Sequence, residues 1–295
     1  MIKRTLFFSN TVCLSLKNKQ LVVKYPQTED ESTVPVEDIG FVVIDNSQIM
    51  ITVPLINALT ENNAAVVFCN DKHLPFSMNL PLDTNTIQSQ LFSNQINAKL
   101  PVKKKCWKQV IESKIANQGS LLEKYGKKAD KLFESARNVK TGDSTNREGY
   151  AAKLYWESLM GKDWYRDRFG IWPNNYLNYG YAILRAAVAR AIVGSGLLPT
   201  LGINHHNKYN AYCLADDIME PYRPFIDDEV MEYINCCDEE EVTQEFKKKV
   251  LQVLTRDVKI GKVKRPLMVA LTMTTASLAK VFAEEETNLV LPVFI

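Results

Sequence analysis

Residues 74–85 read LPFSMNLPLDTN, and the spacing of apolar residues changes on either side of them. Before this stretch lie short β-branched and aromatic segments of the kind that form strands. After it, apolar residues recur three and four positions apart, as on one face of an amphipathic helix. Its two prolines predict a connector. We therefore predict an α+β protein, with a small β-rich N-terminal domain over residues 1–78 and a larger all-α C-terminal domain over 79–295.

Both predicted domains can be divided into elements. In the first we expect one short helix near residues 53–63 and strands at 5–10, 11–16, 20–25, 41–44, 49–53 and 64–69. In the second, the apolar periodicity predicts helices over 87–100, 103–126, 130–140, 146–160, 174–196, 207–220, 239–258 and 266–285. The segment 174–196 is so rich in apolar and small residues that it must be central.

The composition is that of a soluble globular protein. The 295 residues are 46% hydrophobic and 24% charged, enough for a real core. No apolar run is long enough to span a bilayer, and no cleavage site follows the N-terminus, so we expect a cytoplasmic protein without a membrane partner. The six cysteines are scattered without CxxC spacing, which argues against a zinc ribbon or a disulfide framework.

The net charge of +2 hides a strong asymmetry. Residues 101–140 contain eleven Lys or Arg against four Asp or Glu, whereas 211–245 contain twelve acids and one base. Such a distribution predicts a basic surface for a polyanion and a separate acidic region. The alternative is that both runs are ordinary solvated helix faces.

Segment 202–221, GINHHNKYNAYCLADDIMEP, brings histidine and carboxylate together. It holds His205 and His206 and, a few turns later, Asp217 and Glu220. These side chains are ligands for divalent metals. On a continuous helix of about 100° per residue, His206, Asp217 and Glu220 lie within about 40° of one face.

The same segment also fits a helix without a metal. Gly202 and Asn204 predict that the helix begins near Asn207, with His205 on the loop that enters it, and two prolines end it just beyond Glu220. In this alternative His205 caps the helix and the carboxylates are solvated. Spacing alone leaves both possibilities open.

Glu148 is a second acid in an unusual place, near the start of a predicted helix whose other early positions are mostly apolar or small. Thr145 precedes it by three residues, which is the spacing of a capping box. Otherwise Glu148 points into the helical domain and meets His205 and Glu220. The residues alone do not decide between these alternatives.

Three segments, in order, resemble motifs of the CRISPR spacer-acquisition integrase (Cas-one) family. NREGYAAKLYW (146–156) resembles its E-G-x-x-A-x-x-Y motif, and NYLNYGYAILRA (175–186) resembles N-x-x-L-N-Y-x-Y-x-x-L. GINHHNKYNAYCLADDIMEPYRP (202–224) is similar to G-x-x-H…L-x-x-D-x-x-E-P-x-R-P. The resemblance covers essentially the whole chain, and its details look like the type II branch.

This resemblance implies metal ligands at Glu148, His205 and Glu220. His205 is preferred to His206 because the family histidine follows G-x-x, and Glu220 stands where many members have Asp. Asp217, one turn earlier, is the expected supporting or alternative ligand. Three further residues are expected to orient the site or contact DNA: His206, Lys208 and Arg223.

The implied activity is a metal-dependent DNA integrase and endonuclease that inserts short DNA fragments into a CRISPR array. A divalent metal lowers the pKa of an attacking hydroxyl and stabilises charge on the phosphoryl oxygens. Two carboxylates and one imidazole suit Mg²⁺ or Mn²⁺. With water as the attacking group the same site is a nuclease.

Basic side chains supply candidate contacts to DNA phosphates. Trp107 lies among them and is expected to anchor its helix in the core rather than stack on a base. The candidates for phosphate contacts are Lys103, Lys104, Lys105, Lys108, Lys114, Lys247, Lys248, Lys249, Arg256, Lys259, Lys262, Lys264 and Arg265.

The resemblance also implies an assembly: a homodimer through the β-rich domain, with the small Cas-two protein bridging two dimers and other type II CRISPR proteins as possible partners. Two alternatives remain. One is a stand-alone structure-specific nuclease with the same three ligands, and the other is a non-catalytic DNA-binding scaffold whose acids only cap helices.

Overall fold

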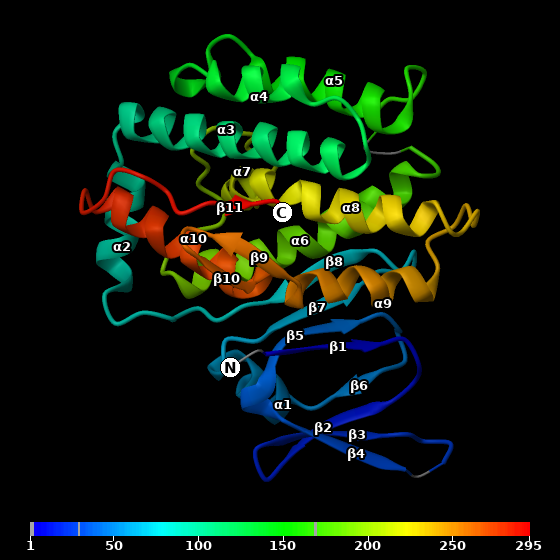
Figure 1. The fold of residues 1–295 in the computed structure, drawn as a ribbon. Helices are drawn as coiled ribbons and strands as arrows, with labels where there is room; N and C mark the ends of the chain where they lie inside the picture. The colour runs from blue at the N-terminus through cyan, green and yellow to red at the C-terminus, as the bar shows by residue number, and fades with distance from the viewer. Residues whose placement is uncertain (1–2, 29, 168–169) are drawn as a thin grey trace. The chain divides into compact units, whose positions relative to one another are not determined.

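The computed structural model describes residues 3–28, 30–167 and 170–295. The chain forms two compact units, Met1–Thr84 and Asn85–Ile295. The first is built around β-strands and the second is mostly helical (Figure 1), which confirms the predicted fold class. Among the described residues no helix is both long and apolar enough to cross a membrane. All six cysteines are free thiols, as the absence of paired spacing predicts.

The first unit contains two four-stranded sheets, ordered β1-β5-β7-β8 and β4-β3-β2-β6. Its elements are β1 (Arg4–Phe8), β2 (Cys13–Lys17), β3 (Gln20–Lys24), β4 (Glu31–Pro35), the 3₁₀ turn η1 (Val36–Asp38), β5 (Ile39–Ile44), β6 (Met50–Ile51), α1 (Val53–Glu61), β7 (Ala65–Cys69) and β8 (Pro75–Asn79). The strands and the short helix predicted before residue 70 are all present.

The core of this unit explains why β5 is a continuous apolar run. All six of its residues are buried, and it runs parallel to both β1 and β7. A strand covered on both faces has no solvent side for polar residues. The apolar side chains of β5 pack with those of β2, β3, β7 and α1 in one cluster.

The predicted connector at 74–85 is wrong in its first half. Pro75–Asn79 forms β8, which pairs antiparallel with β7 at the edge of its sheet. Proline is tolerated at the start of an edge strand because its missing N–H is not needed there. Pro75 therefore does not mark a break in structure, whereas Pro81 lies in the irregular segment between β8 and the next helix, near the division between the two units.

The second unit is mostly helical. Its helical elements are α2 (Gln88–Asn97), α3 (Leu100–Lys124), α4 (Asp130–Arg137), η2 (Thr141–Asp143), α5 (Arg147–Met160), α6 (Asn174–Gly194), α7 (Cys213–Met219), η3 (Glu220–Tyr222), α8 (Arg223–Ile234), α9 (Gln244–Gln252), η4 (Val253–Thr255) and α10 (Leu267–Phe282). As predicted, α6 is central: most of its side chains are buried, and it contacts α7, α8, α9 and α10.

This unit also contains a small sheet that the all-α prediction missed. Strands β9 (Asp257–Ile260), β10 (Val263–Pro266) and β11 (Pro292–Val293) pair in the order β10-β9-β11. The predicted helix over 239–258 therefore ends early, at α9 and η4. The alternation of apolar and basic residues in 258–264 is a strand signal that helical periodicity nearby obscured.

Candidate metal and DNA site

The segment before α7 is a loop, so the helix predicted from Asn207 is wrong. The side chain of Asn207 accepts a hydrogen bond from the Tyr209 N–H, and that of Asn210 accepts one from the Tyr212 N–H. Such local side-chain turns compete with helix formation. The helix begins only at Cys213, so the helical-face argument that favoured His206 does not hold.

The prolines expected to end that helix have a different role. Pro221 lies in η3 and Pro224 lies in the first turn of α8, where a missing N–H costs nothing. The backbone therefore stays close to helical from α7 through η3 into α8. Glu220 lies at the start of η3 and is buried.

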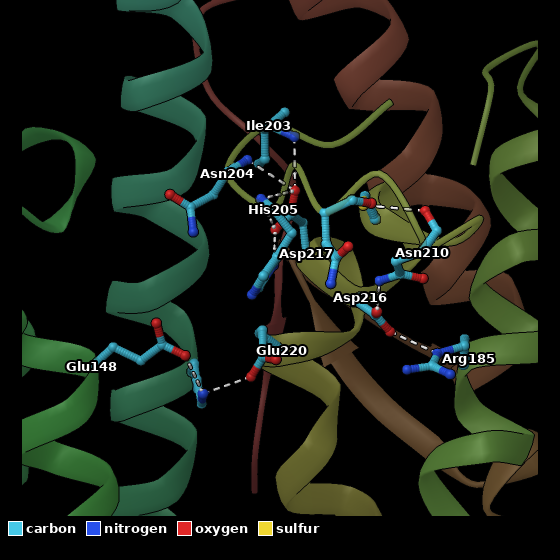
Figure 2. A network of polar contacts seen from close by, with 12 residues as sticks. Glu148, Arg185, Ile203, Asn204, His205, Asn210, Asp216, Asp217 and Glu220 are labelled. Carbon is cyan, nitrogen blue, oxygen red and sulfur yellow. Dashed lines mark hydrogen bonds and ion pairs between the residues drawn. The ribbon is translucent and has the colours of Figure 1, made fainter. Parts of the chain in front are cut away.

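Asp217 organises the loop around His205 (Figure 2). Its carboxylate accepts hydrogen bonds from the backbone N–H groups of Ile203 at 2.7 Å and Asn204 at 2.9 Å. It also accepts one from the His205 N–H at 3.2 Å and lies 2.5 Å from His205 Nδ1. With this many partners Asp217 supports the histidine and leaves Nε2 as the free ring nitrogen.

The loop packs so closely that residue 202 must be glycine. A Cβ at Gly202 would collide with the His205 carbonyl and come within 2.8 Å of the Asp217 carboxylate. The first of these is backbone and cannot rotate away. The hydrogen bond with Asp217 raises the pKa of His205 despite partial burial. The rings of Trp107 and His205 meet edge to face, with their centroids 5.7 Å apart. Trp107 is only 3% exposed, which confirms it as a core anchor.

Glu148 does not form the capping box with Thr145. Asn146 is the N-cap of α5 and accepts from the Gly149 N–H, while the Asp143 carboxylate accepts from the N–H groups of Arg147 and Glu148. Since these residues satisfy the helix N-terminus, the Glu148 side chain is free to turn toward α3.

Lys114 joins the two predicted acid ligands. Its Nζ lies 2.7 Å from Glu148 Oε1 and 2.6 Å from Glu220 Oε2. Figure 2 shows Glu148 and Glu220 on different elements, with their carboxylates pointing toward the same space. Burial would lower the pKa of Lys114, but the two carboxylates outweigh it and raise that pKa. The amine is therefore a cation between two anions, and Lys114 is not an exposed phosphate contact.

Arg223 holds the other Glu220 oxygen. Its Nε donates to Glu220 Oε1 at 2.8 Å, and its guanidinium stacks on the Tyr181 ring at 4.4 Å. Burial alone would raise the pKa of Glu220, but Arg223 and Lys114 more than offset it and lower that pKa. Glu220 is thus held as a buried carboxylate.

The remaining predicted residues lie farther out. His206 is exposed and makes no polar contact within the described ranges. Lys208 is exposed, with its amine 4.9 Å above the Tyr209 ring. Both lie on the loop that carries His205, whereas Arg223 contacts Glu220 directly.

The predicted acidic region is only in part an acidic surface. Its exposed acids are Asp238, Glu239, Glu240, Glu241 and Glu245. Other acids have partners inside the unit. Asp216 is bonded to Arg185 Nε at 2.6 Å and to Asn210 Nδ2 at 2.7 Å. Asp227 and Asp228 on α8 are also buried with partners. Much of the charge in 211–245 is therefore neutralised inside the helical unit.

The donor set fits a divalent cation, although within the described residues no three His, Cys, Asp or Glu side chains are grouped closely enough to hold one. Glu148 and Glu220 already share one positive charge. The buried Glu220 Oε2 has the Lys114 amine as its ion-pair partner at 2.6 Å. Two carboxylates that face one buried positive charge, beside an oriented imidazole, suit a hard cation such as Mg²⁺ or Mn²⁺.

A cavity of about 560 Å³ adjoins this cluster. Glu220, Lys114 and Arg223 are among its lining residues. Aromatic and cationic side chains from α5, α6 and the segment between them line the rest, among them Trp156, Trp164 and Arg166. The cavity is therefore both apolar and positively charged, which suits a nucleotide.

Lys114 is the residue that sequence reasoning misplaced, because it was grouped with the lysines of 103–108 as a phosphate contact. Its position on the helix distinguishes it from those lysines. Lys114 follows Trp107 by seven residues, Val110 by four and Ile111 by three, which places it on the apolar face of α3. A lysine on that face needs an anionic partner.

Known proteins share both the sequence and the fold. A sequence profile of the family described as "CRISPR associated protein Cas1" matches residues 6–263. A protein named CRISPR-associated endonuclease Cas1 from Neisseria meningitidis serogroup C (strain 8013) is 38% identical over 229 residues, which cover 77% of this chain and 74% of that protein.

Two solved structures share the fold at low sequence identity. A casposase bound to integration product matches with a TM-score of 0.78 and 20% identity, over 98% of this chain and 92% of the casposase. A Cas6-RT-Cas1–Cas2 complex matches with a TM-score of 0.71 and 16% identity, over 97% of this chain and 35% of the matched chain.

Proposed function

The chain belongs to the CRISPR-associated Cas1 family, and from that premise we propose that it is a metal-dependent DNA integrase and endonuclease. It inserts short DNA fragments into a CRISPR array by attack of a 3′-hydroxyl on a phosphodiester. Glu148, His205 and Glu220 are the proposed metal ligands, and the type II assignment stays a prediction from the sequence.

One observation carries this proposal. Glu148 on α5 and Glu220 on η3 are far apart in the sequence, yet both carboxylates contact a single cation, Lys114 Nζ. Two acids from different elements, held around one buried positive charge beside His205, are arranged as a cation site.

The surrounding residues keep these groups in place. Asp217 fixes the ring orientation of His205 through Nδ1 and so presents Nε2. Arg223 fixes Glu220 through Oε1 and leaves Oε2 toward Lys114. A bound Mg²⁺ or Mn²⁺ supplies Lewis-acid stabilisation of the phosphoryl oxygens and lowers the pKa of the attacking hydroxyl.

DNA is the proposed substrate, and the cavity beside Glu220 is the proposed place for the strand end. Trp156 and Trp164 offer faces for bases, and Arg166 and Arg223 offer positive charge for phosphates. The fold shared with a casposase bound to integration product supports this assignment. Lys208 and His206, on the exposed loop beside His205, are proposed DNA contacts.

The proposed assembly follows the relatives. We propose a homodimer through the β-rich unit, and a Cas2 protein that bridges two dimers, in keeping with the fold shared with a Cas6-RT-Cas1–Cas2 complex. Such an assembly separates two active sites by a fixed distance, which suits insertion of both ends of one fragment. We propose that this takes place in the cytoplasm.

Hydrolysis is the second candidate activity, because the N. meningitidis relative is named an endonuclease. The residues that orient a 3′-hydroxyl also accommodate water, so both reactions use one site. A nuclease that acts without partners would cut DNA alone and show no strand transfer.

The test is strand transfer by Glu148→Ala, His205→Ala and Glu220→Ala, with and without Mn²⁺. Each variant is expected to lose activity while it still unfolds cooperatively. Full activity in all three variants would contradict the proposed metal site. Activity lost in His206→Ala but kept in His205→Ala would show that His206, and not His205, is the ligand. A wild-type protein that cuts DNA alone but never joins it would favour the stand-alone nuclease.

A further inference from the structure

The β9–β10 hairpin carries unbalanced positive charge. Lys259 on β9 lies directly opposite Lys264 on β10 in the strand register, and both are exposed. Like charges in direct cross-strand pairs are destabilising by themselves. Lys262 in the turn and Arg265 on β10 add two more exposed cations, and Asp257 is the only acid in residues 257–266.

Most other cations of the C-terminal region already have partners within the helical unit. Arg256 pairs with Asp228 at 2.7 Å, Lys249 lies 3.8 Å from Glu232, and Lys247 is buried against the Tyr179 ring. By contrast, Lys259 and Lys264 form no ion pair with any residue that the structure describes. Apart from Lys248 on α9, which is exposed and forms no ion pair with a described residue, the basic residues of this region divide into a partnered group and an unpaired group on one hairpin.

The hairpin is held rigidly, which fixes the spacing of these charges. Val258 and Ile260 are fully buried on its inner face, β11 pairs with the other side of β9, and both strands of the hairpin contact α10 (Figure 1). Side chains directly opposite across the ladder are about 5 Å apart, and those two residues apart on one strand are about 7 Å apart.

We propose that the outward face of this hairpin, formed by Lys259, Lys262 and Lys264 with Arg265 at its edge, binds the phosphate backbone of duplex DNA. This inference rests on the proposed function for the identity of the nucleic acid. A rigid set of lysines without acid partners recognises regularly spaced phosphates and reads no sequence.

Duplex rather than single-stranded DNA is the partner, because the hairpin offers no ring on which an unpaired base would stack. Residues 257–266 contain no aromatic residue. Single-strand binding surfaces combine positive charge with aromatic platforms. Four aromatic side chains of this unit, Trp156, Trp164, Tyr165 and Tyr181, line the cavity beside Glu220 instead. The hairpin therefore holds double-stranded DNA while the cavity takes a strand end.

Salt-dependent binding of the full chain to a labelled duplex tests this surface. Lys259→Gln with Lys264→Gln is compared with Lys127→Gln with Lys128→Gln, which removes the same charge from an exposed loop after α3. The plot of log affinity against log salt has a negative slope, and its magnitude is expected to decrease by about two in the hairpin variant. Each lost phosphate contact lowers that magnitude by about 0.9. The loop variant is expected to keep the wild-type slope.

An unchanged slope in the hairpin variant, or an equal change in the loop variant, would overturn the assignment. An equal or larger loss on a single strand of the same length would overturn the choice of duplex. Failure of the proposed function has a different signature. In that case wild type would still bind duplex through the hairpin but would show no strand transfer, whereas Glu220→Gln is expected to keep the binding slope and lose the reaction.

Discussion

Two clusters of buried acids lie in the helical unit and differ in how completely their oxygens are satisfied. Asp228 receives Lys124 at 2.6 and 2.7 Å, Arg256 at 2.7 Å and the Tyr125 hydroxyl at 3.1 Å. Glu220 has one partner on each oxygen among the described residues, Arg223 at 2.8 Å and Lys114 at 2.6 Å.

The difference teaches how to separate a structural acid from a functional one. Both clusters are buried and both are rich in cations, so neither burial nor charge distinguishes them. What distinguishes the two clusters is the number of partners on each carboxylate oxygen. Asp228 receives two contacts on each oxygen and has no capacity left for a ligand, whereas each oxygen of Glu220 has one partner among the described residues and Glu220 lines a cavity.

The largest expected effect comes from removing the charge of Glu220. Glu220→Gln is expected to lower strand transfer about a thousandfold, or about 4 kcal/mol of transition-state stabilisation, because the amide is a poor ligand for a hard cation. Single-turnover rates give the kinetic effect, and Mn²⁺ electron paramagnetic resonance gives the binding effect. Undiminished rates together with undiminished Mn²⁺ binding would place Glu220 with the structural acids.

Asp228→Ala is expected to act on stability instead. It leaves Lys124 and Arg256 beside an empty site, and breaking such a pair costs about 3 kcal/mol, the lower end of the usual range because both cations are partly exposed. Urea unfolding measures this loss. Strand transfer per folded molecule should match wild type. If the variant folded stably but lost activity, the comparison between the two clusters would fail.

Asp227, beside Asp228, provides a pH-dependent test. Burial raises its pKa to about 6, although the hydroxyls of Tyr155 and Tyr181 donate to it and favour the charged form. The ordinary value is near 4, so between about pH 4 and pH 6 the folded chain binds this proton more tightly than the unfolded chain. This contribution to stability is complete below pH 4 and is lost as the pH rises through 6.

The size of that contribution is about 3 kcal/mol, since each pKa unit corresponds to about 1.4 kcal/mol. Asp227→Asn is always neutral and is expected to lack it. The free energy of unfolding of wild type relative to Asp227→Asn should therefore fall between pH 4 and pH 7. Parallel pH profiles for the two proteins would show that Asp227 ionises in the folded state as easily as in the unfolded chain.

The sequence predicts the elements of this protein better than it predicts their side-chain contacts. Apolar periodicity found α3 and α6, and β-branched runs found β5 and β7, because those patterns follow directly from burial. It did not find the loop before Cys213, where asparagine side chains override helical spacing.

Contacts between residues far apart in the sequence are the second feature that the sequence predicts poorly. The grouping of Glu148 with Glu220 came from resemblance to a family, and Lys114 between them was not foreseen, since nothing local distinguishes it from exposed lysines except its helix face. The β9–β10 hairpin has a readable alternation, but its partner β11 lies more than 25 residues away. Contacts of that kind depend on tertiary packing.

The smallest expected effects lie at the start of α5, where the sequence left a capping box between Thr145 and Glu148 open. In the structure Asp143 accepts from two backbone N–H groups, and the exposed Thr145 has no such bond. Asp143→Ala is therefore expected to cost about 1 kcal/mol, and Thr145→Ala less than about 0.5 kcal/mol. Urea unfolding at neutral pH measures both. A larger loss for Thr145→Ala would mean that Glu148 serves the helix N-terminus, and it would then be a structural acid like Asp228 and not a partner of Glu220.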